Sequence, residues 1–245
     1  MRTKDSKQDE TMNKLITGVL AAMLYLAVPL SQAAEDKPTW DGLTEIKPKR
    51  MDVAYVLPGA DFSKYSKLMF DPVEVAFKND WAENYNRNTT LSQRLTPEHI
   101  EKTAQAAKDA FTEAFAEEYK KAGLQIVTES GPDVLRIRPG VVDLYIIAPD
   151  TMTAGRSRTY TMESGEATLF LEARDSTTGA LLGRALDRRE TRNTGRVQIS
   201  NSVTNLSDFK ALFRQWAGIS IKGFKELQEL SPIPADLKPG QKLQD

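Results

Sequence analysis

The chain has 245 residues, of which 27% are charged, with a formal net charge of −1, no cysteine and one histidine. Such a balanced charge excludes a general electrostatic attraction to nucleic acid or to an anionic membrane surface. The residue counts also exclude disulfide bonds, thiolate metal sites and any zinc site that needs two histidines.

The first segment with a clear character is an uncharged apolar run over residues 15–30, which follows a basic residue. Small residues come after it, ending at Ala33. A basic start, a short apolar run and small residues before the cut are typical of a secretory signal peptide. The sequence therefore predicts a signal peptide over residues 1–33, cut between Ala33 and Ala34, with Met12 as an alternative start. We expect a periplasmic protein, or alternatively a secreted one.

Membrane attachment is not expected. Ala34 occupies the position where a bacterial lipoprotein has its lipid-bearing cysteine, so no lipid anchor is predicted. A transmembrane helix needs about 20 apolar residues, and no segment after Ala33 approaches that length.

The exported part begins with a polar segment over residues 34–50, which we interpret as an extended N-terminal arm. Apolar residues then recur in strand-like patterns at 53–57 and at 67–77. Pro72 interrupts the second run, which indicates a bulge or an edge position because proline cannot donate to a strand ladder. Residues 78–95 are polar and are predicted to form a surface loop.

A long helix is predicted over residues 97–122. Thr96 suits its N-cap, Pro97 suits its first position, and Gly123 can end it. Its apolar residues recur at spacings of three and four and form one stripe: Ile100, Ala104, Ala107, Phe111, Phe115 and Tyr119.

The segment that follows is rich in strands. Residues 124–127 predict a short strand, and residues 133–148 predict either one strand bent at a bulge or two strands. Residues 166–174 and 180–191 alternate on either side of a turn that Asp175 opens, a pattern typical of a β-hairpin.

A last helix is predicted to begin with Asn205 as its cap. One apolar stripe follows: Leu206, Phe209, Phe213, Trp216, Ser220, Phe224 and Leu227. Residues 231–245 contain three prolines without an apolar period, so we expect a flexible tail. The fold class predicted from this order is α+β: a two-layer sandwich with a mainly antiparallel sheet and two long amphipathic helices on one face, as a single domain over residues 51–230.

Four segments carry a resemblance to a known family: residues 55–75, 141–150, 155–161 and 171–191. They resemble the bacterial family known as domain of unknown function 3313. The resemblance implies an exported protein of Gram-negative bacteria, and it transfers no catalytic residue because the family has no established activity. Many members are predicted lipoproteins, and this chain departs from them at Ala34.

The residues themselves predict no catalytic site, no cofactor and no metal site. His99 is expected to be a surface residue of the long helix. Paired carboxylates can hydrolyse glycosidic bonds without histidine, and Asp143, Asp187 and Glu190 lie on or beside predicted strands. Asp175 has a simpler role, because an aspartate that opens a tight turn can bond its own backbone. We expect Asp187 to form salt bridges with neighbouring arginines.

Arginines are concentrated between residues 155 and 197, where no lysine occurs. The planar guanidinium group can bind a carboxylate or phosphate through two hydrogen bonds. Strand alternation places Arg184 and Arg188 on one face. The sequence predicts that these residues form a site for an anion or a partner: Arg156, Arg158, Tyr160, Arg184 and Arg188. Solvated ion pairs are the alternative interpretation.

The predicted function is that of a non-catalytic binding or envelope-associated module. Its partner would be an envelope protein or an anionic envelope polymer. The alternative is a carboxylate-based hydrolase that acts on cell-envelope glycan, which would require two carboxylates about 5–10 Å apart in a cleft.

Overall fold

A computed structural model describes residues 41–147, 159–161, 165–191, 198–200 and 202–243. The predicted signal peptide, its cleavage position, Arg156 and Arg158 lie outside these residues. The described residues all lie in one compact unit.

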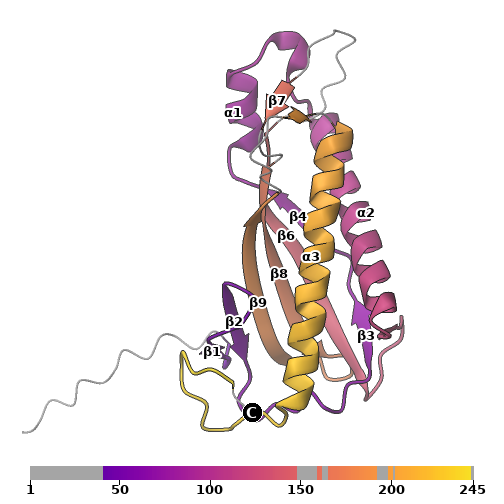
Figure 1. Cartoon of the computed structure of the whole chain (residues 1–245), viewed down its shortest axis with the longest axis vertical. Coiled ribbons are helices and arrows are strands. Elements are labelled where there is room, and N and C mark those ends of the chain that lie inside the picture. The colour runs from indigo at the N-terminus through magenta and orange to yellow at the C-terminus, as the bar shows by residue number, and fades with distance from the viewer. Residues whose placement is uncertain (1–40, 148–158, 162–164, 192–197, 201, 244–245) are drawn as a thin grey trace, which may run out of the picture. The chain divides into compact units, whose positions relative to one another are not determined.

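An eight-stranded sheet forms the centre of this unit (Figure 1). Its strands lie in the spatial order β1 (Thr44–Ile46), β2 (Val53–Val56), β9 (Leu181–Glu190), β8 (Gly165–Asp175), β6 (Val134–Ile146), β3 (Lys67–Phe70) and β5 (Gln125–Ile126), and β4 (Glu74–Phe77) also pairs with β6. The neighbouring strands β1, β2, β9, β8 and β6 pair in the antiparallel sense. β3 and β4 run parallel to β6, and β5 runs parallel to β3. A separate two-stranded sheet pairs β7 (Thr159–Thr161) with β10 (Gln198–Ser200).

The strand-rich middle of the chain follows the sequence pattern closely. β6 is one strand, with a register shift between Val142 and Tyr145, where Asp143 adopts a positive φ of 51°. β8 and β9 form the predicted hairpin. Asp175 stabilises its turn, because one carboxylate oxygen accepts from the backbone N–H of Thr177 at 3.0 Å.

Helix α2 (Pro97–Lys121) begins where the sequence predicts. The hydroxyl of Thr96 accepts a hydrogen bond from the His99 backbone N–H, and the His99 Nδ1 atom accepts one from the Thr96 N–H. His99 therefore has a structural role at the helix N-terminus, where it satisfies a backbone donor that the helix leaves unpaired. Gly123 follows the helix with a φ of 76°.

Helix α3 (Ser202–Glu229) lies beside α2 and begins before the predicted cap at Asn205 (Figure 1). Aromatic residues of the predicted stripes connect the two helices: Phe111 and Phe213 lie 5.5 Å apart between ring centroids. The core continues to the sheet, where the ring centroids of Phe70 and Tyr119 lie 5.1 Å apart. The described structure is thus a mixture of helices and an open sheet, which confirms the predicted combination of α and β elements.

Two local predictions need correction. The predicted loop at 78–95 contains helix α1 (Trp81–Arg87) and the single 3₁₀ turn η1 (Leu91–Gln93). Trp81 fixes α1 in place. Its ring stacks on Phe77 with the ring centroids 4.4 Å apart, and its Nε1–H donates to the Ile146 carbonyl. The predicted strand at 67–77 is divided at Pro72 into β3 and β4, and both pair with β6 in the parallel sense.

The flanking segments also differ from expectation. Part of the predicted arm forms β1. In the predicted flexible tail, Ile233 is 2% exposed and joins the core. Its N–H donates to the Ala60 carbonyl at 2.8 Å, and its carbonyl accepts from the Gly59 N–H at 3.0 Å. Burial of Ile233 and Leu237 therefore holds residues 231–243 against the domain, which corrects the prediction for them.

Candidate functional site

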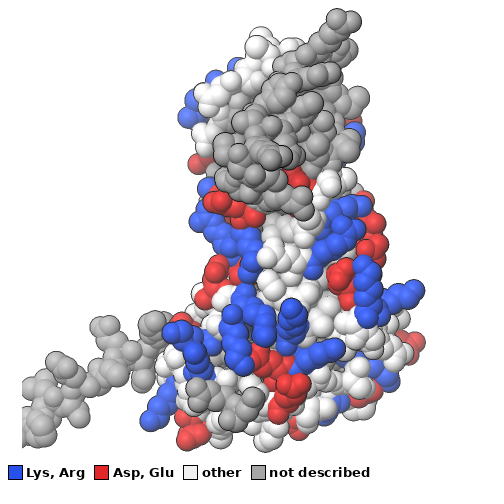
Figure 2. Space-filling view, viewed as in Figure 1, with Lys and Arg blue, Asp and Glu red and all other residues white. Residues whose placement is uncertain are grey.

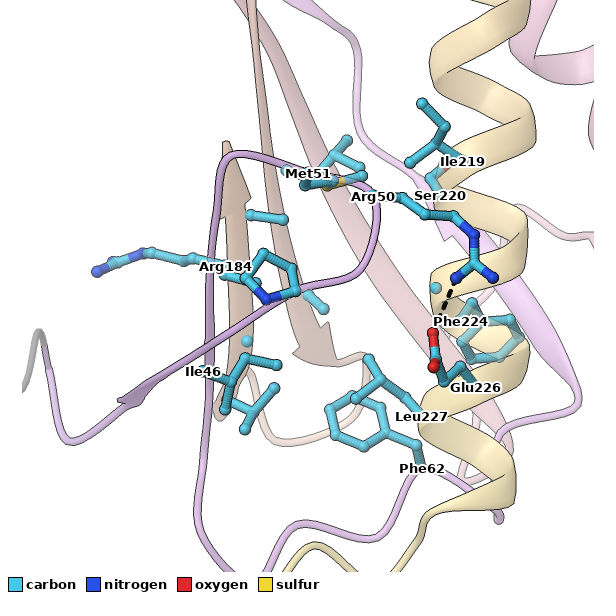
Figure 3. A pocket seen from close by; sticks show the side chains of 18 of the residues that line it. Ile46, Arg50, Met51, Phe62, Arg184, Ile219, Ser220, Phe224, Glu226 and Leu227 are labelled. Carbon is cyan, nitrogen blue, oxygen red and sulfur yellow. Dashed lines mark hydrogen bonds and ion pairs between the residues drawn. The ribbon is translucent and has the colours of Figure 1, made fainter. Parts of the chain in front are cut away.

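An apolar pocket lies between the C-terminal half of α3 and the sheet (Figure 3). Its volume is about 170 Å³. The sheet side of its wall is formed by apolar residues of β2, β3, β6, β8 and β9: Ala54, Val56, Leu68, Leu135, Ile137, Leu171, Ala173 and Ala185. Phe62 and Leu243 complete the wall from outside the sheet.

The hollow exists because small residues face each other across the two elements. On α3, Gly223 lies between the larger wall residues Ile219 and Leu227. Apart from its chain neighbours and the backbone of its own helix, a Cβ atom built on Gly223 would meet no described atom within 4 Å. Ala173 and Ala185 are equally small on the sheet side. The absence of side-chain volume at these positions leaves the space open.

The hydroxyl groups deep in the wall already have hydrogen-bond partners. The Tyr119 hydroxyl and the Ser220 Oγ lie 2.8 Å apart, and the Ser220 hydroxyl donates to the Ala217 carbonyl at 2.9 Å. Burial raises the pKa of Tyr119 to about 12, against a smaller opposing effect of the Ser220 hydrogen bond. Tyr119 is therefore uncharged at neutral pH, and the wall suits an apolar guest.

The mouth of the pocket is charged. Lys47, Lys49 and Arg50, on the loop between β1 and β2, are exposed, and Glu226 faces them from α3. Glu226 forms ion pairs with Lys49 and with Arg50, whose Nη1 lies 3.0 Å from its Oε2 (Figure 3). Burial disfavours the charged form of Glu226, but hydrogen bonds and charge from Lys49 and Arg50 prevail and lower its pKa.

Figure 2 shows the same face of the molecule as Figure 1, with Lys and Arg side chains gathered over its lower half around a smaller acidic group. The pocket thus combines an apolar interior with a predominantly basic rim.

Arg184, a predicted site residue, belongs to a partly buried ion-pair network, in which Glu172 is 5% exposed and Asp41 is 59% exposed. Its Nε lies 2.9 Å from Oε2 of Glu172, and its Nη1 lies 2.8 Å from Oδ2 of Asp41. The Arg184 side chain is only 9% exposed and extends away from α3 (Figure 3). Burial disfavours the charged form of Glu172, but hydrogen bonds from Arg174 and Arg184 prevail and lower its pKa.

Of the two predicted site arginines whose side chains the structure describes, Arg188 is the more accessible, with 61% of its side chain exposed. Its Nη2 lies 2.5 Å from Oε2 of Glu166, which also binds Lys78 at 2.8 Å. Tyr160 pairs with Ile199 through its backbone. The structure places Arg184 and Arg188 on one strand, and the five-residue site remains a prediction.

The three carboxylates of the hydrolase alternative have different environments, and Asp187 is the one that is buried with side-chain partners. Asp187 is 1% exposed and accepts hydrogen bonds from Arg189 Nε at 2.5 Å and from Trp216 Nε1 at 2.8 Å. The predicted salt bridge of Asp187 is therefore present. Glu190 pairs in register with Glu166, and Asp143 lies exposed at the β6 register shift.

Asp175 is bound by donors from several segments. Its Oδ2 accepts from the Tyr65 hydroxyl at 2.7 Å and from Lys64 at 3.2 Å. The backbone hydrogen bond from Thr178 and the Tyr65 hydrogen bond are the main causes that lower the pKa of Asp175. This arrangement confirms the turn-stabilising role predicted for it.

Within the described ranges, no group of three or more His, Asp or Glu residues is placed to hold a metal ion. Over the same ranges, none of the helices is long and apolar enough to cross a membrane.

The sequence pattern predicts the helix stripe that lines the pocket, but it does not predict the pocket. Ser220, Phe224 and Leu227 were all in the predicted stripe of α3. A signal was present in Gly223, which lies within that stripe and adds no side chain to it. Its meaning depended on which small residues of the sheet would lie opposite, and the sequence alone did not show this.

The chain matches the family described as "Protein of unknown function (DUF3313)" over residues 31–219, and it belongs to this family. A comparison with curated proteins finds no match. Among solved structures, the chain is similar to the PelC dodecamer from Paraburkholderia phytofirmans, with 10% identity, a TM-score of 0.33, and coverage of 68% of this chain and 94% of that chain. It is also similar to protein XCC0632 from Xanthomonas campestris, of the family DUF330, with 12% identity, a TM-score of 0.31, and coverage of 69% and 85%. At these values the structural similarities carry no functional argument.

Proposed function

We propose that this family member is an exported, non-catalytic binding module of the bacterial envelope, which takes the apolar chain of an amphiphile into the pocket beside α3. The observation that carries the proposal is the apolar pocket of about 170 Å³ with an open, charged mouth. An engineered apolar cavity of about 150 Å³ stays dry and binds benzene, so a pocket of this size admits an apolar group on that scale. The end of an acyl chain meets this requirement.

The proposal includes a location and an architecture. Residues 1–33 support export to the periplasm, or secretion, through their signal-peptide pattern. The two-layer sandwich predicted from the sequence fits the contacts of α2 and α3 with each other and with residues of the sheet. In such an arrangement, a pocket between a helix and the sheet lies where the two layers separate.

Two of the candidate carboxylates, Asp187 and Asp175, have structural roles that do not suit hydrolysis. A carboxylate pair that hydrolyses glycan needs both groups free to reach the substrate. Asp187 is buried against Arg189 and Trp216, and Asp175 is held by the turn that it stabilises. The arginine site that includes Arg188 remains a second proposal, supported by the 61% exposure of that side chain.

A pair of glycine substitutions tests the proposal. Gly223 and Gly218 both lie in α3, and only Gly223 lines the pocket. Apart from chain neighbours and the backbone of the helix itself, a Cβ at either position meets no described atom within 4 Å. Gly223→Leu places a side chain in the hollow, and Gly218→Leu is the matched control. Both changes remove a helical glycine, which favours the helix by about 0.5–1 kcal/mol.

The measurement is the binding of the neutral apolar fluorophore N-phenylnaphthylamine to the purified protein, followed by its displacement with dodecanol. We expect the wild type and Gly218→Leu to bind equally, and Gly223→Leu to bind at least about tenfold more weakly, which is a loss of about 1.4 kcal/mol. Thermal unfolding of each variant separates lost binding from lost folding. Equal binding by Gly223→Leu and the wild type would refute the pocket as the site.

A further inference from the structure

The mouth of the pocket holds two ion pairs that link separate elements. Lys49 and Arg50 come from the loop between β1 and β2, and Glu226 comes from α3, which forms one wall. These pairs therefore connect the two sides of the entrance, and Figure 3 shows the pair between Arg50 and Glu226. We call Lys49, Arg50 and Glu226 the mouth triad.

The mouth triad is held weakly enough to open. The side chains of Lys49 and Arg50 are 50% and 41% exposed, so water screens their attraction to Glu226. Ion pairs of such exposed groups contribute little to stability. A second carboxylate or a phosphate at the mouth can therefore take the place of Glu226 without a large loss of free energy.

The charges of the rim favour an anionic guest. Lys47, Lys49 and Arg50 lie within four positions of the chain, and Glu226 is the acidic residue that lines the pocket with them. Arg184 also lines the pocket, but its charged end extends away from α3 to Glu172 and Asp41. The guanidinium group of Arg50 can bind a carboxylate or phosphate through two hydrogen bonds, and the apolar wall begins directly behind it.

From this juxtaposition we infer that the ligand is a single-chain anionic amphiphile, whose head group replaces Glu226 as the partner of Lys49 and Arg50 while its chain enters the apolar pocket. The inference rests on the proposed function and adds the charge of the ligand and the way in which the mouth opens. A fatty-acid carboxylate and an alkyl phosphate share this chemistry.

Chain-matched ligands test the inference, because they differ only in the head group. Dodecanoate, dodecyl phosphate, dodecanol and dodecyltrimethylammonium are titrated below their micelle concentrations, with displacement of N-phenylnaphthylamine as the readout. For the wild type we expect at least one of the two anions to bind about tenfold or more tightly than dodecanol, and the cation to bind more weakly than dodecanol. The better of the two anions identifies the head group.

The variants assign this preference to the mouth triad. Lys49→Gln with Arg50→Gln should remove the preference for anions and should weaken dodecanol binding far less than anion binding. Glu226→Gln should strengthen anion binding severalfold, because the competing carboxylate is gone, and should change the affinity for dodecanol much less than the affinity for the anions.

A matched control is present elsewhere in the chain. Lys121 and Arg214 both pair with Glu117, and their side chains are 63% and 43% exposed. Lys121→Gln with Arg214→Gln, and Glu117→Gln, should alter none of these affinities, because none of the three residues lines the pocket. An altered anion preference in these controls would show a general charge effect and would overturn the assignment to the mouth.

The outcomes separate this inference from the function on which it rests. If no dodecyl compound displaces the fluorophore from the wild type, the proposed function fails together with the inference. If anion, alcohol and cation bind alike and the variants of the mouth triad change nothing, apolar binding stands and the anionic ligand is refuted.

Discussion

The contact between Asp187 and Trp216 offers a direct test of whether the buried aspartate is structural. Asp187 lies on β9 and is 1% exposed, and Trp216 lies on α3 and is fully buried. The Trp216 Nε1–H donates to Asp187 Oδ2 at 2.8 Å, so the bond links helix to sheet inside the core. Asp187→Ala would leave the indole N–H without this acceptor.

The expected magnitude follows from burial. An unsatisfied buried donor costs about 1–3 kcal/mol, and a hydrogen bond to a charged group contributes about 1.5–3 kcal/mol. The Arg189 side chain is 29% exposed, so water can replace part of its contact with Asp187. We therefore expect Asp187→Ala to lower the free energy of unfolding by about 2–4 kcal/mol.

A double-mutant cycle with Trp216→Phe isolates the hydrogen bond. Urea unfolding followed by far-ultraviolet circular dichroism gives the free energies without relying on tryptophan fluorescence. The coupling energy should be about 1.5–3 kcal/mol, since the pair is in direct contact. A coupling below about 0.5 kcal/mol, or an Asp187→Ala variant as stable as the wild type, would refute the structural role.

Two further predictions concern stability. Hydrogen bonds hold the pKa of Asp175 below its ordinary value of 3.8. The stabilising effect of the ionised carboxylate is therefore complete above pH 3.8 and is lost as the pH falls through and below that value. Urea unfolding from pH 7 to pH 3 should show a smaller loss of stability in Asp175→Asn than in the wild type, and parallel losses would contradict this account. Ile233→Ala should lower the free energy of unfolding by about 2–5 kcal/mol, because Ile233 is buried in the core. Asp236→Ala, at an exposed position of the same segment, should leave the free energy of unfolding unchanged. A negligible loss in Ile233→Ala would show that the tail does not depend on this contact.

The elements that could be predicted from the sequence are those whose signals are local. Helix α2 carries its cap at Thr96 and its stop at Gly123, and the β8–β9 hairpin carries its turn at Asp175, so each is specified within a few residues. Helix α1 was missed because its order depends on Trp81, which packs on Phe77 and bonds to a carbonyl far along the chain.

Tertiary pairing limited the remaining predictions. The parallel pairing of β3 and β4 with β6 depends on how a crossover folds back, and residues 67–77 alone give no information about that. The tail was predicted to be flexible from its prolines, yet Ile233 meets a core that is built by distant segments. For Arg184, alternation predicted the face of the strand but could not identify Glu172 as its partner.

The pocket combines two features that lower stability without a ligand. A glycine in a helix interior, here Gly223, costs about 0.5–1 kcal/mol relative to alanine. A cavity of 170 Å³ costs at most about 4 kcal/mol at roughly 24 cal/mol per Å³. A ligand that fills the space and binds only the folded chain raises the free energy of unfolding, by an amount that grows with the logarithm of its concentration relative to its Kd. The same residues that weaken the empty protein therefore make its stability responsive to an amphiphile, which a well-packed core at this position would not achieve.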